Sequence, residues 1–208
     1  MVMLQGSLFD HGERVGPRSP GTRLARTDLG QGAWIDVGPG WLAGADMLFD
    51  QLLHTVPWRA ERRPMYDRVV DVPRLMSFYG ENDDLPHPAL EEVRDALVES
   101  YRNEVGGPFV TAGLCLYRDG RDSVAFHGDR IGRGATEDTL VAIVSVGSTR
   151  RLLLRPRGGG RALRYELGSG DLVVMGGTCQ RTWEHAIPKT SRPVGPRISM
   201  QFRPSGVR

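Results

Sequence analysis

The second half of the chain carries a succession of short strand-like segments joined by glycine-bearing turns. Eight segments after Gly107 show the apolar or alternating pattern typical of strands. They are Val110–Tyr117, Ser123–His127, Leu140–Val146, Arg151–Arg155, Ala162–Leu167, Asp171–Met175, Thr182–Ile187 and Arg197–Arg203. Eight short strands with hairpin turns favour two facing sheets. We therefore predict a mainly β domain with flanking helices (α+β), built as a double-stranded β-helix, or jelly roll.

The first half of the chain predicts fewer elements. A short strand is expected at Ala33–Val37, and helices at Ala45–Thr55 and Pro88–Val105, which would brace one outer face of the sheets. Residues 1–30 are rich in Gly, Pro, Arg and Ser without periodicity, which indicates a flexible N-terminal arm. We expect residues 31–208 to form a single domain with a jelly-roll core at about 108–204.

Composition limits the class of protein more than its function. An apolar content of 39% over 208 residues is enough for one buried core, and the net charge of +2 says little about partners. Two isolated cysteines, Cys115 and Cys179, indicate reduced thiols rather than a disulfide framework. The sequence contains no run of about 18 apolar residues, so no membrane span is predicted. The N-terminus lacks the apolar core of a signal peptide. We expect a cytoplasmic protein, with no membrane partner.

The last strand-like segment, RISMQFR, alternates strictly between polar and apolar residues. Its polar face would carry Arg197, Ser199, Gln201 and Arg203. Six strand steps separate the two arginine Cα atoms by roughly 20 Å, at about 3.3 Å per residue. Because each side chain reaches several ångströms, a short dicarboxylate fits between the two guanidinium groups. An ordinary half-buried strand with solvated arginines is the alternative.

Three further residues form a possible metal-binding set. His127 and Asp129 stand two apart in FHGD, so in a strand both would face the same side. His185 lies in the later segment WEHAI. Two histidines and one carboxylate make the facial triad that holds ferrous iron with open coordination positions. Taken singly, the pair is more often a surface histidine beside a solvated carboxylate, and His185 a satisfied core or surface histidine.

The residues from Gly113 to Pro204 resemble the AlkB family of Fe(II)- and 2-oxoglutarate-dependent dioxygenases. The resemblance rests on LYRDGRDSVAFHGD, LVAIVSVG, YELGSGDLVVMGG, WEHAIP and RISMQFR, in that order. Upstream, FDQLLHTVPW and VPRLMSFYGE also look like elements of the family, so that the resemblance covers most of the chain from about Leu42. It implies Fe(II) as cofactor, 2-oxoglutarate as co-substrate and O2 as oxidant.

The resemblance also implies roles for individual residues. His127, Asp129 and His185 would bind the iron and form the catalytic centre. The co-substrate would be bound by Tyr117, Arg197, Ser199 and Arg203, with Arg197 on its distal carboxylate and Arg203 near its metal-proximal end. Two positions depart from the family: Cys115 and Ser199 stand where asparagine is common. Both positions lie near the co-substrate, so its pocket differs from the family pattern there.

The substrate implied by the resemblance is an alkylated base, such as 1-methyladenine or 3-methylcytosine, in DNA or RNA, and we expect the nucleic acid to be single-stranded. A nucleotide-recognition lid is expected at about residues 60–85, with substrate contacts from Tyr66, Arg74, Tyr79 and Trp183. For each aromatic residue, plain packing is the alternative. The aromatic partner that would stack on the base is not identifiable, because NDDLPHPAL follows the lid motif without Tyr or Phe. We expect a monomer.

Clustered arginines suit a nucleic-acid partner. RRLLLRPRGGGRALR holds six arginines between Arg150 and Arg164, and a second group comprises Arg62, Arg63, Arg68 and Arg74. Such patches match phosphate backbones, whereas a solvated hairpin is an equally good interpretation of the first.

Two other functions stay open at this point. The same fold supports hydroxylases and demethylases of proteins or small molecules, which would not bind single strands in a salt-sensitive way. A non-catalytic nucleic-acid-binding homologue is the third possibility, motivated by Cys115 and Ser199. The intact metal triad and both arginines argue against it.

Overall fold

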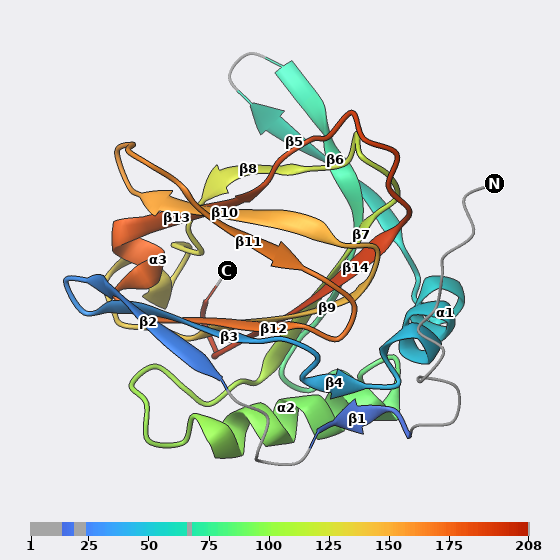
Figure 1. Cartoon of the computed structure of the whole chain (residues 1–208), viewed down its shortest axis with the longest axis horizontal. Coiled ribbons are helices and arrows are strands. Elements are labelled where there is room, and N and C mark those ends of the chain that lie inside the picture. The colour runs from blue at the N-terminus through green and yellow to red at the C-terminus, as the bar shows by residue number, and fades with distance from the viewer. Residues whose placement is uncertain (1–13, 19–23, 66–67, 208) are drawn as a thin grey trace.

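The computed structural model of the chain describes residues 14–18, 24–65 and 68–207, and its side chains at 63–71 are not described. Within these ranges two sheets face each other, as the sequence predicted (Figure 1). The larger sheet has the order β2-β3-β12-β9-β14-β7-β6-β5, and the smaller has the order β11-β10-β13-β8. This arrangement is a double-stranded β-helix with helices on one outer face.

The strands of the large sheet are β2 (Ala25–Gly30), β3 (Ala33–Gly38), β5 (Arg59–Met65), β6 (Arg68–Tyr79), β7 (Thr111–Tyr117), β9 (Val141–Gly147), β12 (Leu172–Gly177) and β14 (Arg197–Arg203). Those of the small sheet are β8 (Val124–His127), β10 (Arg150–Pro156), β11 (Leu163–Leu167) and β13 (Trp183–Ile187). A separate two-stranded sheet pairs β1 (Gly16–Pro17) with β4 (Leu42–Ala43). The helices are α1 (Ala45–Thr55), α2 (Pro88–Ser100), the short α3 (Cys179–Thr182) and a 3-10 turn at Arg133–Ala135.

Two hydrophobic clusters lie on opposite faces of the large sheet. The outer cluster packs α1 and α2 against it, through Leu48 and Leu52 of α1 and Leu90 and Leu97 of α2. The inner cluster fills the space between the two sheets. β14 shows the division directly, because its even residues Ile198, Met200 and Phe202 belong to the outer cluster. Its odd residues therefore face the space between the sheets, as the alternation predicted.

The helix α2 is shorter than predicted. It begins at Pro88, as expected, but ends at Ser100 rather than Val105. Tyr101 leaves the helical conformation, although its N–H still donates to the Leu97 carbonyl. Its hydroxyl donates to Asp36 at 2.9 Å, and its ring stacks on Trp34. These contacts with β3 are not local in sequence, so periodicity could not place the end of the helix.

Part of the predicted N-terminal arm is a strand. Residues 1–13 and 19–23 lie outside the described residues, but β2 pairs with β3 along the edge of the large sheet. Its residues are nearly all exposed, which explains why no apolar alternation was visible. Backbone pairing and the ion pair between Arg26 and Asp36, at 2.8 Å, hold it in place.

The predicted lid region begins with a long hairpin. β5 and β6 pair with each other, and β6 continues the sheet by pairing with β7. The hairpin extends from the body of the molecule (Figure 1). None of the helices in the described residues is both long enough and apolar enough to cross a membrane.

Candidate active site

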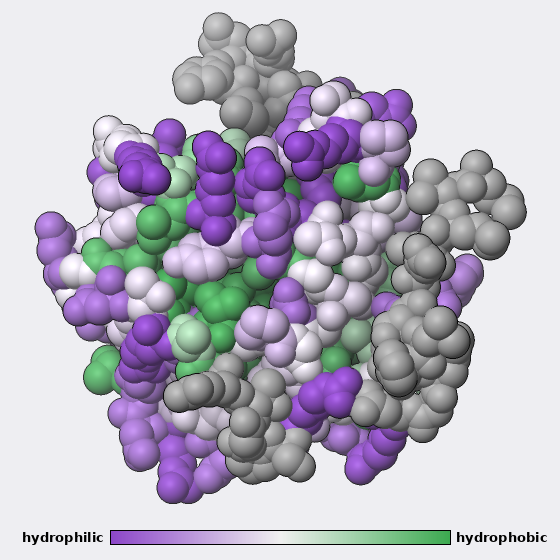
Figure 2. Space-filling model, in the orientation of Figure 1, coloured by the Kyte–Doolittle hydropathy of each residue, from purple (hydrophilic) through white to green (hydrophobic). Residues whose placement is uncertain are grey.

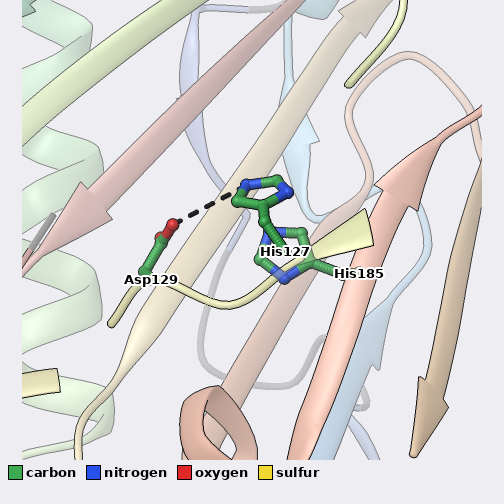
Figure 3. Close-up of side chains that lie close together, drawn as sticks. All are labelled: His127, Asp129 and His185. Carbon is green, nitrogen blue, oxygen red and sulfur yellow. Dashed lines mark ion pairs between the residues drawn. The ribbon is translucent and has the colours of Figure 1, made fainter. Parts of the chain in front are cut away.

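His127 and His185 lie opposite each other on neighbouring strands of the small sheet. The register pairs them directly across β8 and β13, and their ring centroids are 4.3 Å apart. Asp129 does not share the strand, as the alternation argument assumed, because β8 ends at His127. The turn after β8 nevertheless brings the carboxylate back toward the two rings (Figure 3).

The three side chains form one compact set of ligand atoms. Each offers one atom, and these atoms lie within 4.8 Å of one another. Nε2 of His127 is 3.8 Å from Oδ1 of Asp129. Two imidazoles and one carboxylate at this spacing fit a ferrous ion that keeps open positions for other ligands.

The tautomer of His127 is set by its backbone neighbour. Its Nδ1 lies 2.8 Å from the carbonyl oxygen of Ala125, which can only accept, so Nδ1 carries the proton. Nε2 then carries the free lone pair, and this atom faces Asp129. A hydrogen bond of this kind orients a ligating imidazole and increases its basicity.

Arg203 fixes the charge of Asp129. Its Nε donates to Oδ2 of the carboxylate at 2.7 Å, which leaves Oδ1 toward the histidines. Burial alone would raise the pKa of Asp129, but Arg203 and the two histidines overcome it and lower the pKa to about 2. The carboxylate is therefore ionised at neutral pH, as metal binding requires.

His185 is buried and neutral. Burial is the main cause that lowers its pKa to about 3, with His127 and Arg203 acting in the same direction and Asp129 against them. A neutral imidazole is the form that binds metal. His127 is the exposed member of the set, with 37% of its side chain accessible, so the set opens to solvent on its side.

The turn that carries Asp129 is held by Gln180 of α3. The side-chain oxygen of Gln180 accepts from the N–H of Asp129 at 2.9 Å, and Gln180 is itself buried. The same residue explains Gly128, because a Cβ there would lie 2.3 Å from the Gln180 carbonyl oxygen. Neither role was visible in the sequence, since Gln180 lies 51 residues from Asp129.

Arg197 lies at the other end of β14, fully buried between the sheets. Its Nη2 donates to Ser145 at 2.7 Å, while Nε and Nη1 have no hydrogen-bond partner among the described residues. Burial lowers the pKa of its guanidinium. A buried cation with two unused donors fits a carboxylate, which accepts two parallel N–H bonds from arginine. The distal carboxylate of 2-oxoglutarate meets that requirement.

Tyr117 lies beside Arg197 in the paired strand β7. Burial is the main cause that raises the pKa of its hydroxyl to about 12, with Arg74, Arg197 and Arg150 opposing the shift. The phenol therefore stays protonated and can donate a hydrogen bond. The donor role that the family resemblance implies requires this protonated form.

The two departures from the family pattern meet through Gln201. Its Nε2 donates to Oγ of Ser199 at 2.9 Å, and its Oε1 accepts from Arg203 at 3.3 Å. The thiol of Cys115 is 3.7 Å from the same oxygen. Cys115 and Ser199 are directly paired across β7 and β14. Gln201 thus links both shortened side chains to the arginine that holds Asp129.

The predicted substrate residues are placed less uniformly. Tyr66 lies outside the described residues. Tyr79 packs against the outer cluster, because alternation along β6 directs it to the helix side, and the structure does not bring it to the metal ligands. Trp183 packs at the edge of the inner cluster. Arg74 of β6 also belongs to the inner side, next to Tyr117 and Cys115.

Half of the arginine cluster between Arg150 and Arg164 has partners inside the protein. Arg150 is buried and donates to the carbonyl oxygens of Asp119, Asp122 and Pro188 at 2.8 to 3.0 Å. Arg151 pairs with Glu166, and Arg155 with Glu184. In the described part of the chain, the exposed side chains of Arg157, Arg161 and Arg164 have no ion pair. Figure 2 shows hydrophilic residues bordering hydrophobic ones on one face of the molecule.

The second arginine group is described only in part. The side chains of Arg63 and Arg68 lie outside those that the structure describes. Arg62 is exposed on β5, whereas Arg74 is largely buried.

Sequence reasoning missed Ser145, Gln180 and Arg150 as residues that support the site. Ser145 had a usable signal, because it is the one polar residue in the apolar strand VAIVSVG. The roles of Gln180 and Arg150 depend on contacts between distant segments and left no local pattern.

Comparisons with known proteins agree with this geometry. A family model described as "2OG-Fe(II) oxygenase superfamily" matches residues 42–203. The alpha-ketoglutarate-dependent dioxygenase alkB homolog 3 of Bos taurus is 31% identical over 186 residues, which cover 79% of this chain and 64% of that protein. The DNA oxidative demethylase ALKBH2 of Mus musculus is 30% identical over 124 residues, covering 56% of this chain and 50% of that protein. The chain thus spans less than two thirds of the length of these relatives.

Two solved structures share the fold. The structure of OsALKBH1 aligns with a TM-score of 0.62 at 15% identity, covering 86% of this chain and 100% of that one. A prolyl hydroxylase from Trichoplax adhaerens, in complex with a hypoxia inducible factor peptide fragment, aligns with a TM-score of 0.58 at 10% identity, covering 81% of this chain and 82% of that one. At these identities the likeness concerns the fold alone.

Proposed function

Because the chain belongs to the 2OG-Fe(II) oxygenase superfamily, and within it to the AlkB family, we propose that it oxidatively removes alkyl groups from bases of DNA or RNA. The single observation that carries the proposal is the convergence of His127, Asp129 and His185 on one point, with Arg203 bonded to the carboxylate. When bound, Fe(II), 2-oxoglutarate and O2 would supply the oxidising chemistry: one oxygen atom of O2 would hydroxylate a carbon attached to the base nitrogen, and the other would be used in the conversion of 2-oxoglutarate to succinate and CO2. The hydroxymethyl product then loses formaldehyde, which restores the base.

The residues of this chain position and shield that chemistry. Asp129 stays ionised because of Arg203, and His185 stays neutral because it is buried. Arg197 offers two N–H groups to the distal carboxylate of the co-substrate, and the protonated Tyr117 donates from the neighbouring strand. The exposed edge of His127 leaves the approach open on the substrate side.

Three observations support a nucleic-acid substrate. Relatives with about 30% identity carry the names of DNA oxidative demethylases and alkB homologues. The exposed arginines Arg157, Arg161 and Arg164 suit phosphate contacts. The hairpin of β5 and β6 comprises most of residues 60–85, for which the sequence predicted a nucleotide-recognition lid.

The test is a demethylation assay with Fe(II) and 2-oxoglutarate on a single-stranded oligonucleotide carrying 1-methyladenine or 3-methylcytosine. Mass spectrometry follows the loss of the methyl group, and the matching duplex is assayed in parallel. We expect demethylation that weakens as salt rises, because phosphate contacts are salt-dependent. Co-substrate turnover on all oligonucleotides without any loss of methyl groups would contradict the nucleic-acid substrate and leave the oxygenase.

A further inference from the structure

Arg74 of β6 lies in one row with Tyr117 and Arg197. Tyr117 is paired with Arg197 across β7 and β14, and Leu75 is paired with Leu116 across β6 and β7. One step along these antiparallel strands places Arg74 beside Tyr117. Arg74 shares its face of β6 with Met76, which packs against the inner cluster. The row therefore puts two guanidinium groups on either side of one phenol, between the two sheets.

Arg74 has few hydrogen-bond partners in the protein besides the thiol of Cys115. Its Nη1 makes one long hydrogen bond, 3.4 Å, to the carbonyl oxygen of Ser123. Its Nε is buried and has no partner in the described part of the chain. Arg150, also near Tyr117, shows the contrast, because it donates to three backbone carbonyls. Arg74 and Arg197 thus share one property, a buried Nε–H without a hydrogen-bond acceptor in the described part of the chain.

The row contains no carboxylate of its own, although Glu61 of β5 acts on Arg74 through its charge. The buried acids among the described residues are Asp36, Asp122 and Asp129. Asp36 is bonded to Arg26, Asp122 to Arg118 and Asp129 to Arg203. The buried Arg197 and the half-buried Arg74 lose hydration without an ion-paired carboxylate among the described residues, which is unfavourable for the fold. Such an arrangement is expected where a ligand brings the anion.

We propose that Arg74 is a further co-substrate-binding residue, which donates to the same distal carboxylate as Arg197. This rests on the proposed function, since it assumes that a dicarboxylate such as 2-oxoglutarate occupies the row. A carboxylate has two oxygens and room for about four hydrogen bonds, so it can accept from both arginines. Arg74 then binds the co-substrate rather than the nucleic acid, which differs from the role expected from the sequence. It also provides a charged donor in a pocket where Cys115 replaces the family's asparagine.

The test measures binding of 2-oxoglutarate without any turnover or nucleic acid. The protein is loaded with Mn(II) in place of Fe(II), and 2-oxoglutarate is titrated by calorimetry into wild type, Arg74→Met, Arg74→Lys and Arg197→Met. Because hydrogen bonds to charged groups contribute about 1.5–3 kcal/mol, we expect Arg74→Met to weaken binding by roughly 10- to 100-fold. Arg74→Lys keeps the charge and should recover part of the loss. The exposed Arg102→Met, on the far side of the domain, is the matched control and should bind as wild type.

Thermal unfolding of the ligand-free proteins separates a binding role from a structural one. Since Arg74 lacks good partners in the protein, Arg74→Met should unfold at the same temperature as wild type or higher, while losing most of the stabilisation that 2-oxoglutarate confers. If Arg74→Met unfolded at a lower temperature but kept its 2-oxoglutarate affinity, Arg74 would have a structural role only, and the proposal would be overturned. Normal 2-oxoglutarate affinity with weakened oligonucleotide binding would overturn it as well, and would leave the proposed function intact. Absence of 2-oxoglutarate binding by the wild type would instead overturn the proposed function, and the role of Arg74 with it.

Discussion

Arg203 donates from Nε to Oδ2 of Asp129 at 2.7 Å, across 74 residues of sequence. One arginine at the end of β14 therefore controls the charge and the orientation of a ligand that lies beyond the end of β8. The bond leaves Oδ1 as the oxygen directed at the two histidines. Metal affinity should consequently depend on a residue that does not itself bind the metal.

Arg203→Met should weaken metal binding and destabilise the protein. Removing one partner of a buried ion pair leaves the other charge uncompensated, which costs roughly 3–5 kcal/mol. The pKa of Asp129 should rise, so that metal affinity falls further below neutral pH. Arg203→Lys retains the charge but not the geometry of Nε–H, so its metal affinity and stability should lie between those of wild type and Arg203→Met. Mn(II) titration followed by electron paramagnetic resonance provides the measurement, and wild-type affinity in Arg203→Met would show that the bond is dispensable.

Gly128→Ala should remove metal binding through a steric effect on the turn. A Cβ at this position would lie 2.3 Å from the backbone oxygen of Gln180, which cannot move aside as a side chain does. The turn must shift, and Asp129 shifts with it. Gly168→Ala is the control, because a Cβ there meets only ordinary contacts at 3.5 Å or more. Equal Mn(II) affinity in the two variants would contradict the steric argument.

Gln180→Leu tests the support of Asp129 by α3. The variant removes the acceptor of the Asp129 N–H, and a buried donor without a partner costs about 1–3 kcal/mol. Loss of a residue that orients a ligand typically lowers metal affinity by about 10- to 100-fold. Chemical denaturation reports the first effect and Mn(II) titration the second. A variant that lost stability but bound Mn(II) as wild type would show that Gln180 serves only the fold.

The metal-free protein should lose stability on mild acidification because of His185. Its pKa falls from an ordinary 6.5 to about 3 in the folded state, mainly through burial. Between about pH 3 and pH 6.5, His185 is therefore protonated in the unfolded chain and neutral in the folded chain. The stabilising contribution is complete above about pH 6.5 and is lost as the pH falls toward 3, at up to about 1.4 kcal/mol per pH unit.

Urea unfolding of the metal-free protein at pH 7, 6, 5 and 4 measures this dependence. His185→Gln cannot take up the proton, so its free energy of unfolding should change less over the same range. Asp129, with its pKa lowered to about 2, adds a separate loss only at lower pH, below about 4. Parallel curves for wild type and His185→Gln would mean that His185 is not the group responsible.

Local patterns in the sequence predicted most of the fold. The alternation of RISMQFR located β14 to the residue and assigned its two faces correctly, because one face is buried against the helices. All eight strands predicted after Gly107 are present, with ends that differ by at most two residues. The strand β2 left no such signal, since nearly every side chain in it is exposed. Strands β5 and β6 were not predicted either.

The sequence indicated the candidate metal ligands, but not the residues that hold those ligands in position. The composition and order of the histidine, aspartate and arginine motifs indicated a family whose membership the comparisons confirm. Alternation explained the polar face of β14, but it was the wrong reason for the approach of Asp129 to His127, because a turn held by Gln180 intervenes. Contacts of this kind join distant segments, and a single sequence carries no record of them.

The most direct measurement is the yield of succinate and of restored base in one reaction, on a methylated single-stranded oligonucleotide with Fe(II), 2-oxoglutarate and O2. For the wild type we predict base restored with a matching amount of succinate, and no restored base when 2-oxoglutarate is omitted. Asp129→Ala should form neither product, because it removes the anionic metal ligand. Wild-type-like yields from Asp129→Ala, or restored base without succinate, would contradict the assignment of this site.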